Sequence, residues 1–247
     1  MVPQMVCQPV HQNTITPDNI SSFIRYCEQG NRYDSLIAIL PHGLDYPVYI
    51  RRATTDVYNF LQVFEEKEYQ NLKSVPDTVV DLGAYVGYVS VYFAAILKSP
   101  RIIAIEPDQQ NFMMLLLNTS PYKSVTCINA GIWNKPCKLS ISDKIGGDWG
   151  TMVTDNSNGS INGITMMDII KDHNLTDIDF LKIDIEGSEK ELFKTGTYEE
   201  WIKRVNIVHC ETHDRFIDGC SSAYNAACSG SEYSCEIINQ AYRYSKT

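Results

Sequence analysis

The stretch TVVDLGAYVG, residues 78–87, decides the fold of this chain. Its first half is a short apolar run rich in β-branched residues, which is typical of a buried parallel strand. The chain then turns at Gly83, and after Gly87 an apolar segment over residues 88–98 is long enough for a helix packed on a sheet. The order of strand, glycine loop and helix predicts the first half of a βαβ unit.

A carboxylate follows the second strand of that unit. Residues 102–105 form another buried run, which stops at Glu106 because Pro107 cannot continue a strand ladder. In nucleoside sites built this way, small residues let the backbone approach the ligand and the carboxylate accepts hydrogen bonds from ribose hydroxyls. Tyr85 stands where the dinucleotide fingerprint needs its second glycine, so a pyrophosphate is poorly held. We therefore expect S-adenosylmethionine as cofactor; an ordinary βα turn is the alternative.

Composition indicates one catalytic α/β domain with a terminal extension. A chain of 247 residues can bury a sizeable core as a single domain. Lysine and arginine number 21 against 30 aspartates and glutamates, which gives a net charge of −9. A surface of that sign repels phosphate backbones, so we expect no nucleic-acid partner.

The sequence predicts a cytoplasmic protein with reduced cysteines. No apolar run is long enough to span a bilayer, and residues 1–10 lack the basic start and apolar core of a signal peptide. The eight cysteines are scattered, and buried thiols are the usual state in a chain of this length. Cys220, Cys228 and Cys235 are clustered without a Cys-x-x-Cys pair, so we expect no zinc site there.

The first 74 residues form a predicted N-terminal extension that caps the core domain of residues 75–247. Residues 1–17 are polar without periodic pattern and predict a loosely held arm. Beyond it the pattern predicts a helix, a strand and a second helix, over residues 19–28, 46–50 and 57–69. The pair Thr55-Asp56 is explained best as the N-terminal cap of the second helix, and a contact with the ligand is the alternative.

After Glu106 the pattern alternates between helix and strand, with one excursion. The predicted elements are a helix, a strand and a further helix, over residues 111–117, 125–132 and 166–173. Asn129-Ala130-Gly131 ends the strand with small residues, where an adenine edge could lie against the backbone. Residues 138–165 are rich in turns and predict a small antiparallel excursion or a mobile loop, in which Trp149 is a lid or a hydrophobic plug.

Ionisable side chains gather at the ends of the predicted strands. Residues 178–185 and 205–210 are two further core strands. In an open α/β sheet the ligand crevice lies at the carboxyl ends of the strands. We therefore expect five groups to converge there: Asp81, Glu106, Asp184, Glu211 and His213. A wet strand face for Asp184 and a surface loop for His213 are the alternatives.

Together these motifs resemble the FkbM family of S-adenosylmethionine-dependent methyltransferases, over residues 46–213. The most specific segment is LKIDIEGSE at 181–189. The other matching segments are VDLGAYVG at 80–87, IEP at 105–107, Asn129-Ala130, residues 165–169 and ETH at 211–213, with YIRR at 49–52 and Thr55-Asp56 upstream. Tyr85, where the family more often has a small polar residue, and Trp149, in a loop that is usually serine-rich, depart from the pattern.

The resemblance implies an α/β, Rossmann-like class I methyltransferase fold, with a mostly parallel central sheet flanked by helices and a small N-terminal extension. It implies in-line, base-assisted O-methylation of a hydroxyl on a sugar, glycan or natural-product small molecule. The expected cofactor-binding residues are Asp81, Gly83, Ala84, Tyr85, Gly87, Glu106, Pro107 and Ala130. The expected catalytic residues are Asp184 and His213, which activate the acceptor, and Glu211, which orients or shares their charge.

Two other functions use the same residues. Asp184, Glu211 and His213 offer oxygen and imidazole ligands for a divalent ion, although we expect transfer without a metal. A non-catalytic member would use the fold as an interaction surface, for which a tyrosine-rich tail is a candidate. Residues 234–244 of that tail are explained more simply as a closing strand or hairpin.

Overall fold

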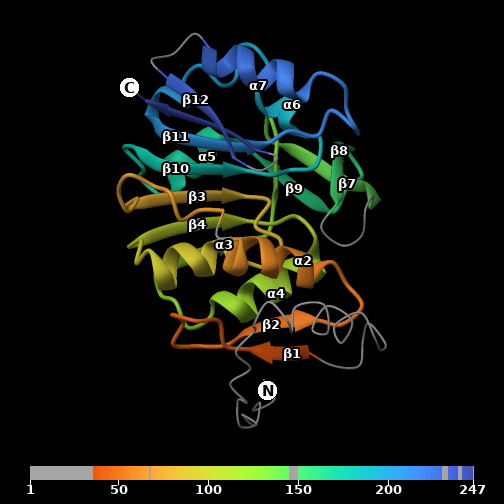
Figure 1. Ribbon diagram of the computed structural model, residues 1–247. Coiled ribbons are helices and arrows are strands. Elements are labelled where there is room, and N and C mark those ends of the chain that lie inside the picture. Colours follow the sequence, from red (N-terminus) through yellow and green to blue (C-terminus); the bar gives the residue numbers. More distant parts are fainter. Residues whose placement is uncertain (1–35, 67, 145–149, 230–232, 239–240, 247) are drawn as a thin grey trace.

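The computed structural model describes residues 36–66, 68–144, 150–229, 233–238 and 241–246. The predicted arm at 1–17, the predicted helix at 19–28 and Trp149 lie outside the described residues. The described chain forms three layers, with a central sheet between two sets of helices (Figure 1).

The central sheet contains seven strands of the described chain. In spatial order they are β5 (Val125–Ile128), β4 (Arg101–Ile105), β3 (Thr78–Leu82), β10 (Ile178–Ile183), β11 (Val205–Glu211), β13 (Ala241–Lys246) and β12 (Tyr233–Ile238). The first five run parallel, and β13 pairs antiparallel with both of its neighbours. The mostly parallel sheet and the closing hairpin are therefore confirmed. Because the order reverses between β3 and β10, the carboxyl ends of these strands form the ligand edge.

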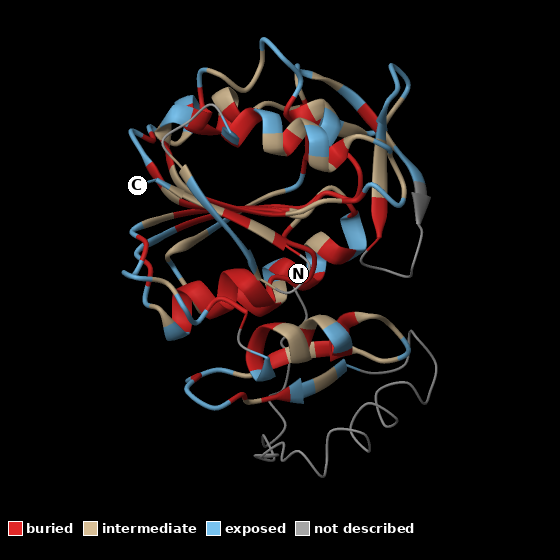
Figure 2. Cartoon of the chain, turned by 45° about the horizontal axis from the view of Figure 1, so that its top comes forward, coloured by how far each residue is buried: buried red, intermediate tan, exposed pale blue. Residues whose placement is uncertain are grey.

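Helices cover both faces because side chains alternate along each strand. On β3, Val80 belongs to the apolar cluster of α5, α6 and α7, whereas Val79 belongs to the cluster of α2 and α3 on the other face. Figure 2 shows the buried strands between these two helical layers. The helical segments are α2 (Asp56–Phe60) with the π-helical η1 (Leu61–Glu65), α3 (Tyr88–Val91) with the π-helical η2 (Tyr92–Ile96), α4 (Gln109–Thr119), α5 (Met166–Asp172), α6 (Glu189–Leu192), the 3-10 helix η3 (Ile202–Arg204) and α7 (Cys220–Ser229).

The described part of the N-terminal extension packs on the α3 side of the sheet. It begins with the antiparallel hairpin of β1 (Leu36–Ile39) and β2 (Val48–Arg51), followed by α2 and η1. Buried side chains of the hairpin and of α2 share one apolar cluster with α3. Polar contacts add to this, since the Tyr88 hydroxyl donates to the Tyr49 carbonyl at 2.7 Å. The division of the chain after residue 74 stays a prediction.

A second sheet occupies the predicted excursion. Its strands, in spatial order, are β6 (Gly131–Ile132), β9 (Ile161–Ile164), β7 (Cys137–Lys144) and β8 (Thr151–Asp155). Strand β7 pairs antiparallel with β8 and with β9, as expected of an antiparallel excursion. The predicted strand 125–132 is split into β5 and β6, and between them Asn129 Nδ2 donates to the Glu106 carbonyl at 2.8 Å.

Within the described ranges, no helix is long and apolar enough to cross a membrane. The six cysteines of these ranges are free thiols, of which Cys210, Cys220 and Cys228 are buried. Burial raises the pKa of Cys228 to about 12, so this thiol is a packed apolar group rather than a reactive one. The cytoplasmic location stays a prediction.

Candidate active site

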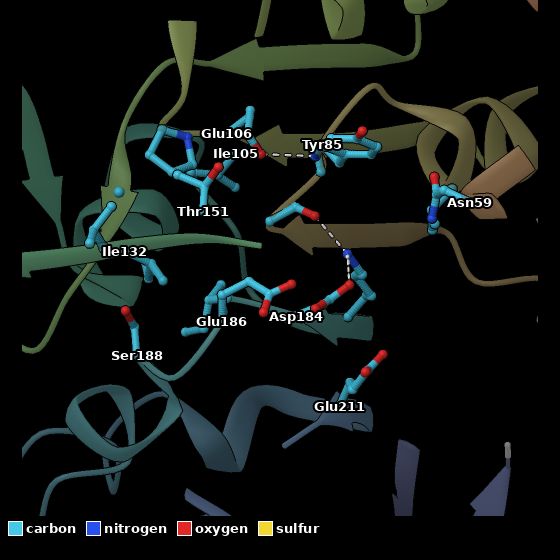
Figure 3. A pocket seen from close by; sticks show the side chains of 18 of the residues that line it. Asn59, Tyr85, Ile105, Glu106, Ile132, Thr151, Asp184, Glu186, Ser188 and Glu211 are labelled. Atoms are coloured by element: carbon cyan, nitrogen blue, oxygen red, sulfur yellow. Dashed lines mark hydrogen bonds and ion pairs between the residues drawn. The ribbon is translucent and has the colours of Figure 1, made fainter. Parts of the chain in front are cut away.

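A cavity of about 340 Å³ opens at the carboxyl ends of β3, β4, β10 and β11 (Figure 3). Its volume lies within the range of small-molecule sites, about 300–1,000 Å³. Eight of the predicted site residues line it: Gly83, Ala84, Tyr85, Glu106, Pro107, Ala130, Asp184 and Glu211. Asp81, Gly87 and His213 do not line it, and each supports a residue that does.

The glycine loop passes under the end of β10 with no room for a side chain. Gly83 has a φ of +74°, and a Cβ added there would lie 1.8 Å from the Asp184 carbonyl oxygen. The backbone N–H groups of Gly83 and Ala84 both donate to the Ile105 carbonyl, at 3.0 and 2.9 Å. The loop is thus tied to β4 on one side and pressed against β10 on the other.

Tyr85 is anchored in the N-terminal extension. Its φ is +51°, a left-handed conformation that costs a non-glycine residue about 1–3 kcal/mol. The hydroxyl donates to Asp56 Oδ1 at 2.6 Å and lies 3.0 Å from Thr55 Oγ1. Arg51 binds the same Asp56 carboxylate through two nitrogens, at 2.8 and 2.9 Å, with its Cζ 5.5 Å from the tyrosine ring centroid.

This anchor gives Asp56 a role that the sequence did not indicate. Thr55 stands at the predicted N-cap position of α2, but its side chain makes no capping bond; the Asp56 backbone N–H donates instead to Thr54 Oγ1, at 3.3 Å. Asp56 is fully buried, and its carboxylate joins the extension to the glycine loop. The tyrosine at the second-glycine position therefore serves the packing of the loop against the extension.

Glu106 closes the other side of the loop. Its carboxylate is buried and accepts from the backbone N–H groups of Tyr85 and Asp108, at 2.9 and 2.8 Å. Burial raises the pKa of Glu106 to about 8, although both backbone donors lower it. Each oxygen keeps a further lone pair, so hydroxyl donors from a ligand would find acceptors here.

Two predicted cofactor residues lie beneath the loop rather than at the cavity. Asp81 is fully buried and accepts from Ser90 Oγ at 2.8 Å. Gly87 has a φ of +89°, and an added Cβ would lie 2.7 Å from Leu115 Cδ1. Both residues shape the loop from below, which is the packing role that the alternative explanation gave to the glycines.

Lys182 is a central residue that sequence analysis passed over. Its buried Nζ donates to the Gly83 carbonyl at 2.7 Å and lies 3.4 Å from Asp184 Oδ2 and 3.5 Å from Asp81 Oδ1. Burial lowers the pKa of Lys182, but Asp184 and Asp81 outweigh it and raise the pKa above its ordinary value. The available signal was a lysine within an apolar strand, two residues before an aspartate.

His213 lies behind the cavity among carboxylates. Its Nδ1 lies 2.9 Å from Glu189 Oε1, and its Nε2 lies 3.6 Å from Asp184, 3.4 Å from Glu186 and 3.7 Å from Glu211. The residue is 1% exposed, so it is not a surface-loop histidine. The convergence of Asp184, Glu211 and His213 agrees with the expectation, whereas Glu186 and Glu189 were not expected, although both belong to the matching segment at 181–189.

The crowding of these groups changes their protonation. Burial and then Asp184 raise the pKa of Glu186 to about 8. The Asp184 charge and then burial raise the pKa of Glu211 to about 7. Burial lowers the pKa of His213, but its bond to Glu189 and the charge of Asp184 outweigh this and raise it to about 9. Burial raises the pKa of Asp184, but Lys182 and His213 together outweigh this effect and lower it.

The family model of the FkbM methyltransferase domain matches residues 81–226, more than half of the chain. The chain belongs to the FkbM methyltransferase family. Its fold is that of the class I methyltransferases, and its cofactor is S-adenosylmethionine. No curated protein matches the chain.

Solved structures of methyltransferases resemble this FkbM chain at low identity. One is an FkbM methyltransferase from Methylobacillus flagellatus, with 17% identity, a TM-score of 0.49, and coverage of 71% of this chain and 45% of that one. Another is TYW2 of M. jannaschii in complex with AdoMet, with 13% identity, a TM-score of 0.45, and coverage of 89% of each chain. A third is a candidate RNA methyltransferase from Pyrococcus horikoshii, with 11% identity, a TM-score of 0.43, and coverage of 93% of this chain and 99% of that one. The present chain thus spans less than half of the Methylobacillus protein.

S-adenosylmethionine fits the residues around the cavity. Glu106 offers lone pairs to ribose hydroxyls, and Ile105, Pro107, Ala130 and Ile132 provide an apolar wall of the kind that suits adenine. On the other side, acidic groups line the cavity at the ends of β10 and β11, where a cationic group is favoured. The residues that line the cavity of this FkbM chain therefore suit the cofactor of its family.

Proposed function

We propose that this chain is an O-methyltransferase, which moves the methyl group of S-adenosylmethionine to a hydroxyl of a sugar, glycan or natural-product small molecule. The observation that carries the proposal is the group of carboxylates Asp184, Glu186 and Glu211, which line the cavity on the side away from Glu106 (Figure 3). Bound S-adenosylmethionine supplies a methyl carbon on a cationic sulfur. As the acceptor oxygen bonds to that carbon and the sulfur–carbon bond breaks, the hydroxyl proton must pass to a base.

The carboxylates are placed to receive this proton. Asp184 and Glu211 line the cavity, so either can reach a hydroxyl bound there, whereas His213 does not line it and contacts the carboxylates from behind. In the proposal Asp184 and Glu211 accept the proton, and His213 shares their charge as a positioning residue. Alignment supplies most of the rate, and the base adds a factor of about 10²–10⁴.

The N-terminal extension supplies the acceptor side of the site in this proposal. Tyr58, Asn59 and Gln62 of α2 and η1 line the cavity. Amide groups pair with hydroxyls as donors and as acceptors, which suits a polyhydroxylated acceptor. The acidic wall disfavours a phosphate-bearing acceptor, so the proposed partner is a small molecule or glycan rather than a nucleic acid.

The first test is cofactor binding. The demethylated product S-adenosylhomocysteine, at about 100 times its Kd, stabilises the fold by about 2.7 kcal/mol. For a domain of this size we expect a rise in unfolding midpoint of roughly 5–10 °C, with no rise for NADH. No rise at saturating ligand would favour the non-catalytic alternative.

The second test is methyl transfer to hydroxylated acceptors, followed by mass spectrometry. We expect Asp184→Asn and Glu211→Gln to lower turnover by about 10²-fold or more. Glu211→Gln should leave the affinity for S-adenosylhomocysteine within about threefold, because this residue lies at the end of β11, away from the glycine loop. Glu200→Gln, at an exposed position, is the matched control and should leave both unchanged. Equal turnover in both carboxylate variants would remove the base from the mechanism.

A further inference from the structure

One group of side chains, two at the cavity wall and one behind it, has the composition of a metal site. Asp184, Glu186 and His213 each offer one ligand atom, and these atoms lie within 4.8 Å of one another. The His213 Nε2 lies 3.4 Å from Glu186 Oε2 and 3.6 Å from Asp184 Oδ1. Two neighbouring ligands at about 2.1 Å from one octahedral ion are separated by about 3.0 Å, so the group needs to close by only about half an ångström to coordinate an ion.

The imidazole points its free nitrogen into this group. His213 is 1% exposed, and its Nε2 makes no hydrogen bond; the buried Glu186 Oε2 also makes none. Behind the ring, Glu189 Oε1 lies 2.9 Å from Nδ1, and its carboxylate also accepts from the Ile185 and Gly187 backbones. A carboxylate in this position holds the ring through Nδ1 and turns Nε2 toward Asp184 and Glu186. This is the usual arrangement behind a metal-binding histidine.

We propose that Asp184, Glu186 and His213 form a site for a divalent cation of the Mn²⁺ class, with Glu211 as a fourth neighbour. Two carboxylates and one imidazole form a mixed oxygen and nitrogen ligand set, which suits Mn²⁺. Ca²⁺ takes oxygen ligands alone, and soft metals prefer thiolates. Glu186 adopts a left-handed backbone, φ +52°, at the turn after β10, and this turn brings its side chain to the histidine.

The charge balance of the site supports a cation. Three carboxylates, from Asp184, Glu186 and Glu211, lie within 3.7 Å of one imidazole nitrogen. Lys182 contacts Asp184 alone of these three. A divalent ion held among these groups would offset the repulsion among the carboxylates.

The site opens toward the acceptor. Its three carboxylate residues line the cavity, so an ion held there faces the space in which a hydroxyl would bind. On the proposed function, the ion would hold the acceptor oxygen and lower the pKa of its hydroxyl. This step alone depends on the proposed function, whereas metal binding itself does not.

The experiment uses Mn²⁺ alone with the purified full chain and no cofactor. The EPR signal of free Mn²⁺ should fall as about one ion binds per chain, and pulsed EPR should show ¹⁴N coupling from one imidazole. His213→Asn should remove that coupling. Glu189→Gln, which changes only the residue behind the ring, should weaken Mn²⁺ binding by about 10–100-fold.

Two further variants keep the test decisive. Glu186→Gln, at the cavity wall, should weaken binding by at least about tenfold and serves if His213→Asn does not fold. Glu200→Gln should bind as the unaltered chain does. Absence of Mn²⁺ binding at millimolar concentration, or binding unchanged in Glu186→Gln and Glu189→Gln, overturns the site. Methyl transfer without Mn²⁺ binding would refute the metal site and leave the proposed function standing. Mn²⁺ binding without methyl transfer to any acceptor would refute the proposed function and leave the metal site standing.

Discussion

Replacing Tyr85 by phenylalanine tests how the extension controls the glycine loop. The substitution keeps the ring and its packing, and removes one hydroxyl that donates to Asp56 Oδ1 at 2.6 Å. Both residues are buried, at 7% and 0% exposure, so water cannot replace the lost bond. Asp56 keeps its two bonds from Arg51 and is not left unpaired.

The magnitude follows from these contacts. A hydrogen bond to a charged group contributes about 1.5–3 kcal/mol, and the remaining partners of Asp56 place the loss near the middle, about 2 kcal/mol. For a chain of this size that is a fall in unfolding midpoint of roughly 4–8 °C. The left-handed backbone of Tyr85 also loses its anchor, so we expect weaker binding of S-adenosylhomocysteine, by about threefold to tenfold.

The assay is thermal and urea unfolding of Tyr85→Phe, with calorimetric titration of S-adenosylhomocysteine. Tyr46→Phe is the matched control, because Tyr46 is 49% exposed, and it should stay within about 0.5 kcal/mol of the unaltered chain. If Tyr85→Phe were as stable as the unaltered chain, the argument for the anchor would fail. Lower stability with unchanged affinity would separate the anchor from the cofactor loop.

Three further predictions concern the same site. Gly83→Ala should lower the unfolding free energy by about 3 kcal/mol or more in urea titration, because the new methyl group meets the Asp184 carbonyl. Gly196→Ala is the control: its φ is similar and nothing lies within 4 Å, so it should cost about 1 kcal/mol. Equal losses in the two variants would contradict this explanation. Because the pKa of Glu106 is about 8 in the folded chain against 4.5 when exposed, the folded chain retains a proton between these values that the unfolded chain releases, so stability falls as pH rises. Glu106→Gln, measured without cofactor, should reduce that slope by about one proton, and an unchanged slope would refute the assignment. Lys182→Met removes the cation beside the fully buried Asp81 and the partly exposed Asp184, and it should destabilise the fold by about 3–5 kcal/mol in the same titration. A loss below about 1 kcal/mol would show that the ion pairs contribute little.

The βαβ core was predictable because its signals are local. A strand of β-branched residues, a glycine turn and an apolar helix follow one another within residues 78–98, and each element forms from its own residues. The same holds for Glu106, since the carboxylate after the second strand must lie at the ligand edge of a parallel sheet. The position of Asp184 and Glu211 follows from this rule in the same way.

Element ends and loop chemistry were predicted less well. The predicted helix 57–69 ends as a π-helical turn at Glu65, and the predicted strand 125–132 is split where Asn129 bonds to the Glu106 carbonyl. Neither the end of the helix nor the split of the strand is visible in the spacing of apolar residues, because each depends on a partner from elsewhere in the chain. The same limit applies to Asp56, whose partner Tyr85 is 29 residues away.

The sequence by itself determined the family, the cofactor class and the set of strand ends at which the site lies. The motifs that carry this information are short and contiguous, and turn geometry acts within a few residues. Only the tertiary structure decided that His213 lies between Glu189 and three further carboxylates, and that Lys182 is buried under the glycine loop. Those contacts depend on the order of β3, β10 and β11 in the sheet and on the left-handed turn at Glu186, so long-range packing sets the chemistry of the site.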